Sequence, residues 1–258
     1  MRYIDLNSDL GEAFGPYNIG NDDEILRHVT SVNIACGFHA GDPNVMKRTV
    51  ENALKNGVAI GAHPGFPDLE GFGRRNMQVS FDEAVNYIIY QVSALDGFVK
   101  AAGGNMQHVK PHGALYNMAA TDYKLARAIA EGIYIVNPKL ILMGLAGSEL
   151  IRAGKAVGLQ TASEVFADRL YTQHGTLLSR SEENAVIMDK EEAAKQVLSI
   201  VKHGKVESVC GREIAIEAHS ICVHGDNEAA LQLLKFVKNS LKNENIATKS
   251  LIDFSTNI

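Results

Sequence analysis

Apolar and polar residues follow two different periods along the chain, and segments of the two kinds alternate. Short runs rich in apolar and β-branched residues predict strands, and these runs cover residues 3–9, 32–36, 58–63, 107–112, 139–145, 159–166 and 220–225. Segments with helical spacing lie between them, the clearest at 45–55, 80–101, 189–202 and 227–242. Because strand and helix alternate about seven times, the pattern predicts a parallel sheet.

Several predicted strands are apolar on both faces. KLILMGL at 139–145 is an example, and such strands are typical of a sheet that helices cover on both sides. At 258 residues we favour a closed or nearly closed barrel over an open sheet, and no G-x-G-x-x-G follows the first strand, which weakens the dinucleotide-binding alternative. We therefore predict an α/β barrel in a single domain over residues 1–258, with a short extra hairpin within 206–220.

The ends of the predicted helices carry capping signals. Asp42 before Pro43 is typical of an N-cap followed by proline at the first helical position. Ser80 and Glu83 have the spacing of a capping box. Gly57 fits the position just after a helix. These signals support the alternation of helix and strand.

Composition excludes several classes of partner. Charged residues make up 21% of the chain, the formal net charge is −5 and no Lys/Arg block stands out, so we expect no nucleic-acid partner. No uncharged stretch is long enough for a bilayer and the N-terminus has no apolar leader, so we expect no membrane partner. Cys36, Cys210 and Cys222 lack a C-x-x-C spacing, which favours a reducing compartment and a cytoplasmic location.

Polar side chains collect where the predicted strands end. They are Asn7, Asp9, Glu12, His39, Asp42, His63, Lys110, His112, Glu164, Asp168, Arg169, His224 and Asp226. In a parallel barrel all strand ends of this kind lie on one rim, which is where such folds build active sites. We therefore predict a polar ring at that rim.

Each member of the ring also has a structural interpretation. Asp42 and Asp226 have the positions of ordinary helix N-caps, and a single histidine is more often a hydrogen-bonded core or surface residue than a functional one. Histidines at four strand ends nevertheless favour function. The other five, His28, His108, His174, His203 and His219, show no such placement and are interpreted as structural.

The ring suits hydrolysis or group transfer. Carboxylates and imidazoles supply general acids and bases, a lysine stabilises an oxyanion, and an aspartate with two histidines holds a divalent metal. The segment GFGRR at 71–75 is either a solvated loop or a clamp in which Arg74 and Arg75 bind a carboxylate or phosphate. No G-x-S-x-G, H-E-x-x-H or P-loop motif is present, so any nucleotide would bind without a P-loop.

Longer motifs identify a family. DLNSDLGE, NIACGFHAGDP, GAHPGFPD, GFGRR, VKPHGALYN, EVFADRLY and VHGD, spread from position 5 to about 226, together resemble the LamB/YcsF family, the A subunits of bacterial ATP-hydrolysing 5-oxoprolinase. The resemblance implies a seven-stranded barrel-like fold of the glycoside hydrolase/deacetylase type. It also implies that 5-oxo-L-proline is opened to L-glutamate while ATP, with Mg²⁺, is hydrolysed to ADP and phosphate, together with subunits B and C.

The resemblance also suggests roles for the ring. We expect a catalytic set of Asp9, His39, His63, Lys110, His112, Glu164 and Asp168, and a substrate-binding set of Asn7, Glu12, Asn33, Arg74, Arg75, Arg169, His224 and Asp226. Arg74, Arg75 or Arg169 would bind the substrate carboxylate or phosphates, and Lys110 would stabilise developing negative charge. His63 or His112, oriented by Asp9 or Glu164, would move protons or activate water.

Two alternatives stay open at this point. One is a metal-dependent deacetylase or amidohydrolase with Asp9, His39 and His63 as ligands. The other is a non-catalytic subunit whose ring only captures substrate for a partner. The need for a tightly bound metal also stays open, because fold alone does not select a reaction.

Overall fold

The computed structural model describes residues 2–17, 21–179, 182, 185–223 and 228–253. Seven parallel strands close into a barrel: β1 (Arg2–Leu10), β2 (Ser31–Ala35), β3 (Ala59–His63), β4 (Met106–Val109), β5 (Ile141–Leu145), β6 (Thr161–Phe166) and β9 (Ser220–Cys222). The barrel closes because β1 pairs with β2 on one side and with β9 on the other. All seven strands predicted from the sequence are present.

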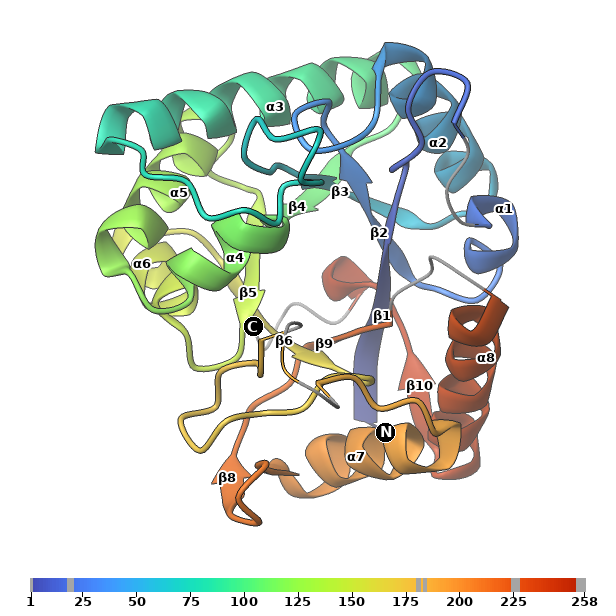
Figure 1. Cartoon of the computed structure of the whole chain (residues 1–258). Helices are drawn as coiled ribbons and strands as arrows, with labels where there is room; N and C mark the ends of the chain where they lie inside the picture. The colour runs from blue at the N-terminus through green and yellow to red at the C-terminus, as the bar shows by residue number, and fades with distance from the viewer. Residues whose placement is uncertain (1, 18–20, 180–181, 183–184, 224–227, 254–258) are drawn as a thin grey trace.

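Helices surround the strands (Figure 1). They are α1 (Asp22–Ile25), α2 (Pro43–Lys55), α3 (Phe81–Ala101), α4 (Gly113–Ala119), α5 (Tyr123–Val136), α6 (Glu149–Val157), α7 (Lys190–His203) and α8 (Glu228–Asn243), followed by a short 3₁₀ helix, η1 (Leu251–Asp253). None of the described helices is long and apolar enough to cross a bilayer. The predicted hairpin is confirmed as β7 (Lys205–Glu207) and β8 (Glu213–Ala215), which pair antiparallel.

Local capping predictions are confirmed. The Asp42 carboxylate accepts hydrogen bonds from the backbone N–H groups of Asn44 and Val45 at the start of α2. Asp42 is therefore the helix cap that its structural interpretation required. Ser80 and Glu83 form both bonds of a capping box at the start of α3. These caps satisfy N–H groups that a helix leaves unpaired in its first turn.

Two strands end three residues earlier than predicted. The fourth strand ends at Val109, not at residue 112, so Lys110 and His112 lie in the connection to α4. Pro111 has no N–H to continue the ladder, which explains the early end. The last strand ends at Cys222 rather than at residue 225. A further short strand, β10 (Ile246–Thr248), pairs with the start of β1 outside the barrel closure and was not predicted.

The two faces of β1 have different chemistry. Ile4 and Leu6 belong to the hydrophobic core, whereas Asp5 and Asn7, although fully buried, contact polar side chains of neighbouring strands. β1 is therefore not one of the strands that are apolar on both faces, because it alternates with period two between core and interior. Part of the barrel interior is therefore polar.

Asp5 belongs to this polar interior. Its carboxylate accepts hydrogen bonds from Thr30 at 2.7 Å, from Ser31 at 2.7 and 2.8 Å, and from Ser220. Burial nevertheless raises the pKa of Asp5 to about 6, because the three hydroxyl donors offset only part of the lost hydration.

His108, on β4, fills the interior opposite Gly61 on β3. A Cβ atom added to Gly61 would lie 2.1 Å from His108 Nε2. That nitrogen is also 2.7 Å from Asn33 Oδ1, so the ring is held in place on its polar side. The glycine is required here by space, not by backbone conformation.

We expect Gly61→Ala to lower the free energy of unfolding by about 1–3 kcal/mol, since the added methyl group must displace a packed imidazole. Gly97→Ala is the matched control, because a Cβ at that position in α3 meets nothing within 4 Å. It should leave stability unchanged or raise it by up to about 1 kcal/mol, from the helix propensity of alanine. Urea denaturation measures both, and equal midpoints for Gly61→Ala and wild type would contradict the packing argument.

The Asp5 carboxyl predicts a pH dependence of stability. Its folded pKa, about 6, lies above the unfolded value of 3.8, so the folded state binds the proton more tightly. The stabilisation is complete below pH 3.8 and is lost as the pH rises through 6. The stability of wild type relative to Asp5→Asn, which keeps an acceptor oxygen but does not titrate, should therefore fall by on the order of 3 kcal/mol between about pH 4 and pH 7. Parallel pH curves for the two proteins would show that Asp5 is ionised throughout.

Candidate functional site

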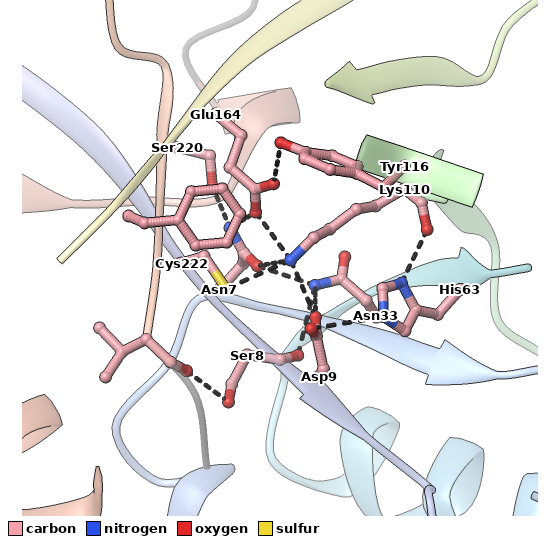
Figure 2. Close-up of polar contacts among 12 residues, drawn as sticks. Asn7, Ser8, Asp9, Asn33, His63, Lys110, Tyr116, Glu164, Ser220 and Cys222 are labelled. Atoms are coloured by element: carbon pink, nitrogen blue, oxygen red, sulfur yellow. Dashed lines mark hydrogen bonds and ion pairs between the residues drawn. The ribbon is translucent and has the colours of Figure 1, made fainter. Parts of the chain in front are cut away.

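Most of the predicted ring lies together at the carboxyl ends of the barrel strands. Figure 2 shows Asn7, Asp9, Asn33, His63, Lys110 and Glu164 pointing toward one another from β1, β2, β3, the β4–α4 connection and β6. Their side chains are joined by hydrogen bonds and ion pairs, with the Lys110 ammonium at the centre. Segments distant in sequence thus contribute to one cluster.

Lys110 is a buried cation held between two carboxylates. Its Nζ lies 2.9 Å from Asp9 Oδ1 and 2.8 Å from Glu164 Oε1, and the residue is only 2% exposed. Burial alone would lower the pKa of Lys110, but the negative charges of the neighbouring acidic groups, Asp9 first, outweigh it and hold the pKa well above its usual value. Lys110 therefore remains an ammonium ion inside the barrel.

Glu164 is fully engaged by donors. Tyr116 Oη donates to Glu164 Oε2 at 2.7 Å, and Asn7 Nδ2 donates to Oε1 at 3.0 Å. Burial, and then the Glu164 charge, raises the pKa of Tyr116 well above its usual value, so the phenol keeps its proton and remains a donor. Among the described residues, Glu164 thus orients Lys110 rather than a histidine.

Asn33 and His108 form a hydrogen-bonded chain that leads to Asp9. Asn33 Nδ2 donates to Asp9 Oδ1 at 2.8 Å and to Asn7 Oδ1 at 2.7 Å, which leaves the Asn33 carbonyl oxygen to accept from His108 Nε2. Burial lowers the pKa of His108 to about 3, so its imidazole is neutral. This role could not be predicted from the sequence pattern, because His108 precedes the end of its strand.

A second group lies beside Asp9. Glu12, His39, His63 and His112, here called the histidine cluster, each offer one ligand atom, and these atoms all lie within 4.8 Å of one another. His39 and His112 stack with ring centroids 3.7 Å apart. His63 Nε2 is 2.9 Å from His112 Nδ1 and 3.3 Å from Asp9 Oδ2.

Burial dominates the electrostatics of the histidine cluster. It lowers the pKa values of His39 and His112 well below the usual range, and the neighbouring imidazoles lower them further. It also raises the pKa of Glu12, although His112 opposes that shift. Neutral imidazoles present lone pairs, so the donor set fits a divalent metal ion.

The predicted arginines have different surroundings. Arg74 and Arg169 line one cavity of about 590 Å³ whose wall includes Gly113 and Ala114, the residues that follow His112. The Arg75 guanidinium is exposed and forms ion pairs with Asp68 and Glu70. The structure therefore groups Arg74 and Arg169 with a cavity beside the cluster, whereas the contacts of Arg75 lie on its own loop.

Three of the predicted site residues, Asp168, His224 and Asp226, come from the segments after the last two barrel strands. Asp168 is buried at the end of β6. Its charge acts on the Cys222 thiol, whose pKa is raised chiefly by burial. His224 and Asp226 lie outside the described residues.

Tyr116 and Cys222 contact the site but were not among the residues predicted from the sequence. Tyr116 stands four residues after His112 in VKPHGALYN, so helical spacing was the available signal.

The geometry combines a buried cation, three carboxylates, three imidazoles and a cavity with arginines on its wall. Groups of these types can bind an anion and stabilise charge that develops during hydrolysis or group transfer. The fold alone would not select this chemistry, but the convergence of these side chains at one rim does favour it.

Known sequences of one family match this chain along nearly its whole length. The LamB/YcsF family profile matches residues 4–256. A protein of Bacillus mycoides (strain KBAB4), named as the A subunit of 5-oxoprolinase, is 61% identical over 94% of this chain and 96% of its own. A protein of the same name from Geobacillus kaustophilus (strain HTA426) is 60% identical over 97% of each chain.

Solved structures confirm the barrel. The lactam utilization protein from Thermus thermophilus superimposes with a TM-score of 0.91 at 42% identity, covering 96% of this chain and 99% of that one. The catalytic domain of a peptidoglycan N-acetylglucosamine deacetylase from Eubacterium rectale has a TM-score of 0.51 at 12% identity, covering 97% of this chain and 88% of that one, and shares the fold only. On its family profile and its relatives, this chain belongs to the LamB/YcsF family.

Proposed function

We propose that this chain is the A subunit of an ATP-dependent 5-oxoprolinase, which opens the lactam of 5-oxo-L-proline to L-glutamate together with subunits B and C. The observation that carries the proposal is the buried Lys110 ammonium between Asp9 and Glu164, beside a cavity lined by Arg74 and Arg169. The names of the relatives, which refer to 5-oxoprolinase and to lactam utilization, support the same substrate class.

The cavity suits a small anionic lactam. The carboxylate of 5-oxoproline needs a cation, and a guanidinium offers a two-pronged donor for a carboxylate or a phosphate. Arg74 and Arg169 both face the cavity, so we assign this role to them rather than to Arg75. ATP would arrive with Mg²⁺ as its counter-ion.

Coupling to ATP addresses the poor reactivity of an amide. The lactam oxygen attacks the γ-phosphorus, the bond to ADP breaks, and the ring carbon becomes more electrophilic. Water adds to that carbon, and the C–N bond then breaks as the nitrogen takes a proton. This leaves a γ-acyl phosphate, which a second water hydrolyses to glutamate and phosphate. These steps depend chiefly on positioning and electrostatics.

The cluster residues suit separate parts of this sequence. The Lys110 ammonium stabilises negative charge on the oxygen of the water adduct, because a fixed donor in a dry site needs no reorganisation. The histidine cluster beside Asp9 activates the attacking water. Asp9 links the two, since its Oδ1 contacts Lys110 and its Oδ2 lies beside His63.

A metal-dependent amidohydrolase that needs no ATP is the second candidate. The convergence of the histidine cluster favours it. The two functions differ in an easily measured requirement, because the second would release product without nucleotide and lose activity with a chelator that spares Mg²⁺. If this chain only captured substrate, it would bind 5-oxoproline, and subunits B and C would release glutamate in the absence of this chain.

We expect glutamate release from 5-oxoproline only when this chain, subunits B and C, ATP and Mg²⁺ are all present, with one ADP formed per glutamate. Lys110→Met in that mixture should reduce the rate about 100-fold or more, the usual cost of losing a donor to an oxyanion. Lys139→Met removes an exposed lysine and is the control. Release of glutamate without ATP, or full activity of folded Lys110→Met, would contradict the proposal.

The neighbouring arginines give a test that does not disturb the buried cluster. Arg74→Ala should raise KM for 5-oxoproline or ATP about 10- to 100-fold, the size of one lost charge-assisted hydrogen bond. Arg75→Ala should leave KM unchanged and lower Tm, because it removes the partner of the buried Asp68 carboxylate. Steady-state kinetics and thermal melts of both variants provide the comparison, and the opposite pattern would move the anion site to Arg75.

A further inference from the structure

We propose that the histidine cluster of Glu12, His39, His63 and His112 binds one divalent transition-metal ion of the zinc type. The inference concerns the chain by itself and does not depend on which substrate it uses. It also changes the ligand set that the sequence suggested, because Glu12 and His112 take the place of Asp9.

Backbone carbonyl groups determine which nitrogens of two histidines carry hydrogen. His63 Nδ1 is 2.7 Å from the carbonyl oxygen of Lys110, and His112 Nε2 is 2.8 Å from that of Phe72. A carbonyl oxygen only accepts, so both of these nitrogens must be N–H donors. In the neutral rings, His63 Nε2 and His112 Nδ1 are consequently lone pairs.

These two lone pairs face each other at 2.9 Å. Two acceptors at that distance repel, so a positive charge has to lie between or beside them. Either one ring carries a second proton, or a cation accepts both lone pairs. The remaining members of the cluster decide between these states.

The surroundings of His39 favour a bound cation over a second proton. The residue is fully buried, and neither ring nitrogen has a hydrogen-bond partner among the described residues. A Cβ on Gly65 would lie 2.6 Å from His39 Nδ1, so backbone closes that side, and Nε2 faces Glu12 Oε1 at 3.4 Å. A proton shared by His63 and His112 would leave His39 unsatisfied, whereas a metal ion would use all three imidazoles.

Two of the separations suit such an ion, whereas His63 Nε2 and His112 Nδ1, at 2.9 Å, would move apart when it binds. Bonds of about 2.0–2.1 Å in a tetrahedral site place ligand atoms about 3.4 Å apart. Glu12 Oε1 lies 3.4 Å from His39 Nε2 and 3.6 Å from His112 Nδ1. Three imidazoles and one carboxylate suit zinc and similar ions, while Mg²⁺ and Ca²⁺ prefer oxygen ligands. Hydrogen bonds from the distal N–H groups to backbone carbonyls are also typical of metal-binding histidines.

Asp9 is less suited to be the carboxylate ligand, because Lys110 and Asn33 already donate to its Oδ1. Within the described part of the chain, the ion pairs of Glu12 are with histidines of the cluster, and its side chain is 14% exposed, which gives an ion a route from solvent. An ion bound there would polarise a carbonyl oxygen or activate a bound water next to Lys110.

The test measures metal binding, not activity. The purified full-length chain is stripped with EDTA, then titrated calorimetrically with Zn²⁺ and, separately, with Co²⁺ while visible absorption is recorded. We expect one ion per chain and the d–d bands of Co²⁺ bound by nitrogen ligands. His39→Ala, His63→Gln and His112→Gln should each weaken Zn²⁺ binding at least about 100-fold. His203→Ala, at an exposed position in α7, is the matched control and should bind as wild type does.

Folding of each variant is checked by near-ultraviolet circular dichroism. If the histidine variants do not fold, Glu12→Gln keeps every imidazole and should still weaken binding and alter the Co²⁺ spectrum. Absence of Zn²⁺ binding by the wild-type chain, or equal binding by folded His39→Ala, would overturn the inference in favour of a shared proton. ATP-dependent glutamate release by protein stripped of zinc-type ions, with Mg²⁺ supplied, would overturn the metal's role in catalysis while leaving the proposed function standing.

Discussion

The Lys110 ion pairs are the interaction on which the site depends. An ammonium ion without water inside a barrel is tolerated only where carboxylates and hydrogen bonds replace its hydration, and loss of one partner leaves an uncompensated charge that costs about 3–5 kcal/mol. Asp9 comes from β1 and Glu164 from β6. Tyr116 and Asn7 hold Glu164 in turn. The charge therefore links strands that are not hydrogen-bonded neighbours, and the site and the closure of the barrel depend on each other.

A polar interior changes where the hydrophobic core lies. Barrels of parallel strands are commonly filled by branched apolar side chains, but here Asp5, Asn7 and His108 occupy interior positions. The apolar residues of β1 instead join the core that the helices cover. Gly61 allows this arrangement, because any side chain there would meet His108. Much of the apolar core thus lies between the strands and the helices, which leaves part of the interior for polar groups.

The sequence predicted the seven strands and the gathering of polar side chains at their ends because both follow from local patterns. Strand ends of a parallel barrel share a rim, so Asp9, His63 and Glu164 could be grouped without coordinates. Pairings between distant residues could not be predicted. Arg74 and Arg75 are adjacent in the sequence, yet Arg75 forms an ion pair with Asp68 while Arg74 lines a cavity, and only the loop geometry determines this difference. β10 has three residues and no periodic signal of its own, so only its pairing with β1 defines it.

The segment after β4 connects the two halves of the site. The Lys110 side chain enters the barrel to meet Asp9, while its backbone carbonyl accepts from His63 and so selects the tautomer of that ring. Pro111 ends the strand, which turns His112 toward His63 instead of continuing the alternation of a β-strand. The stretch from Lys110 to His112 therefore positions the ammonium ion, determines which nitrogen of His63 is protonated, and places the His112 imidazole. A displacement of this backbone would change the ammonium and the histidine cluster together, so their chemistry is coupled through main-chain geometry rather than through a side chain alone.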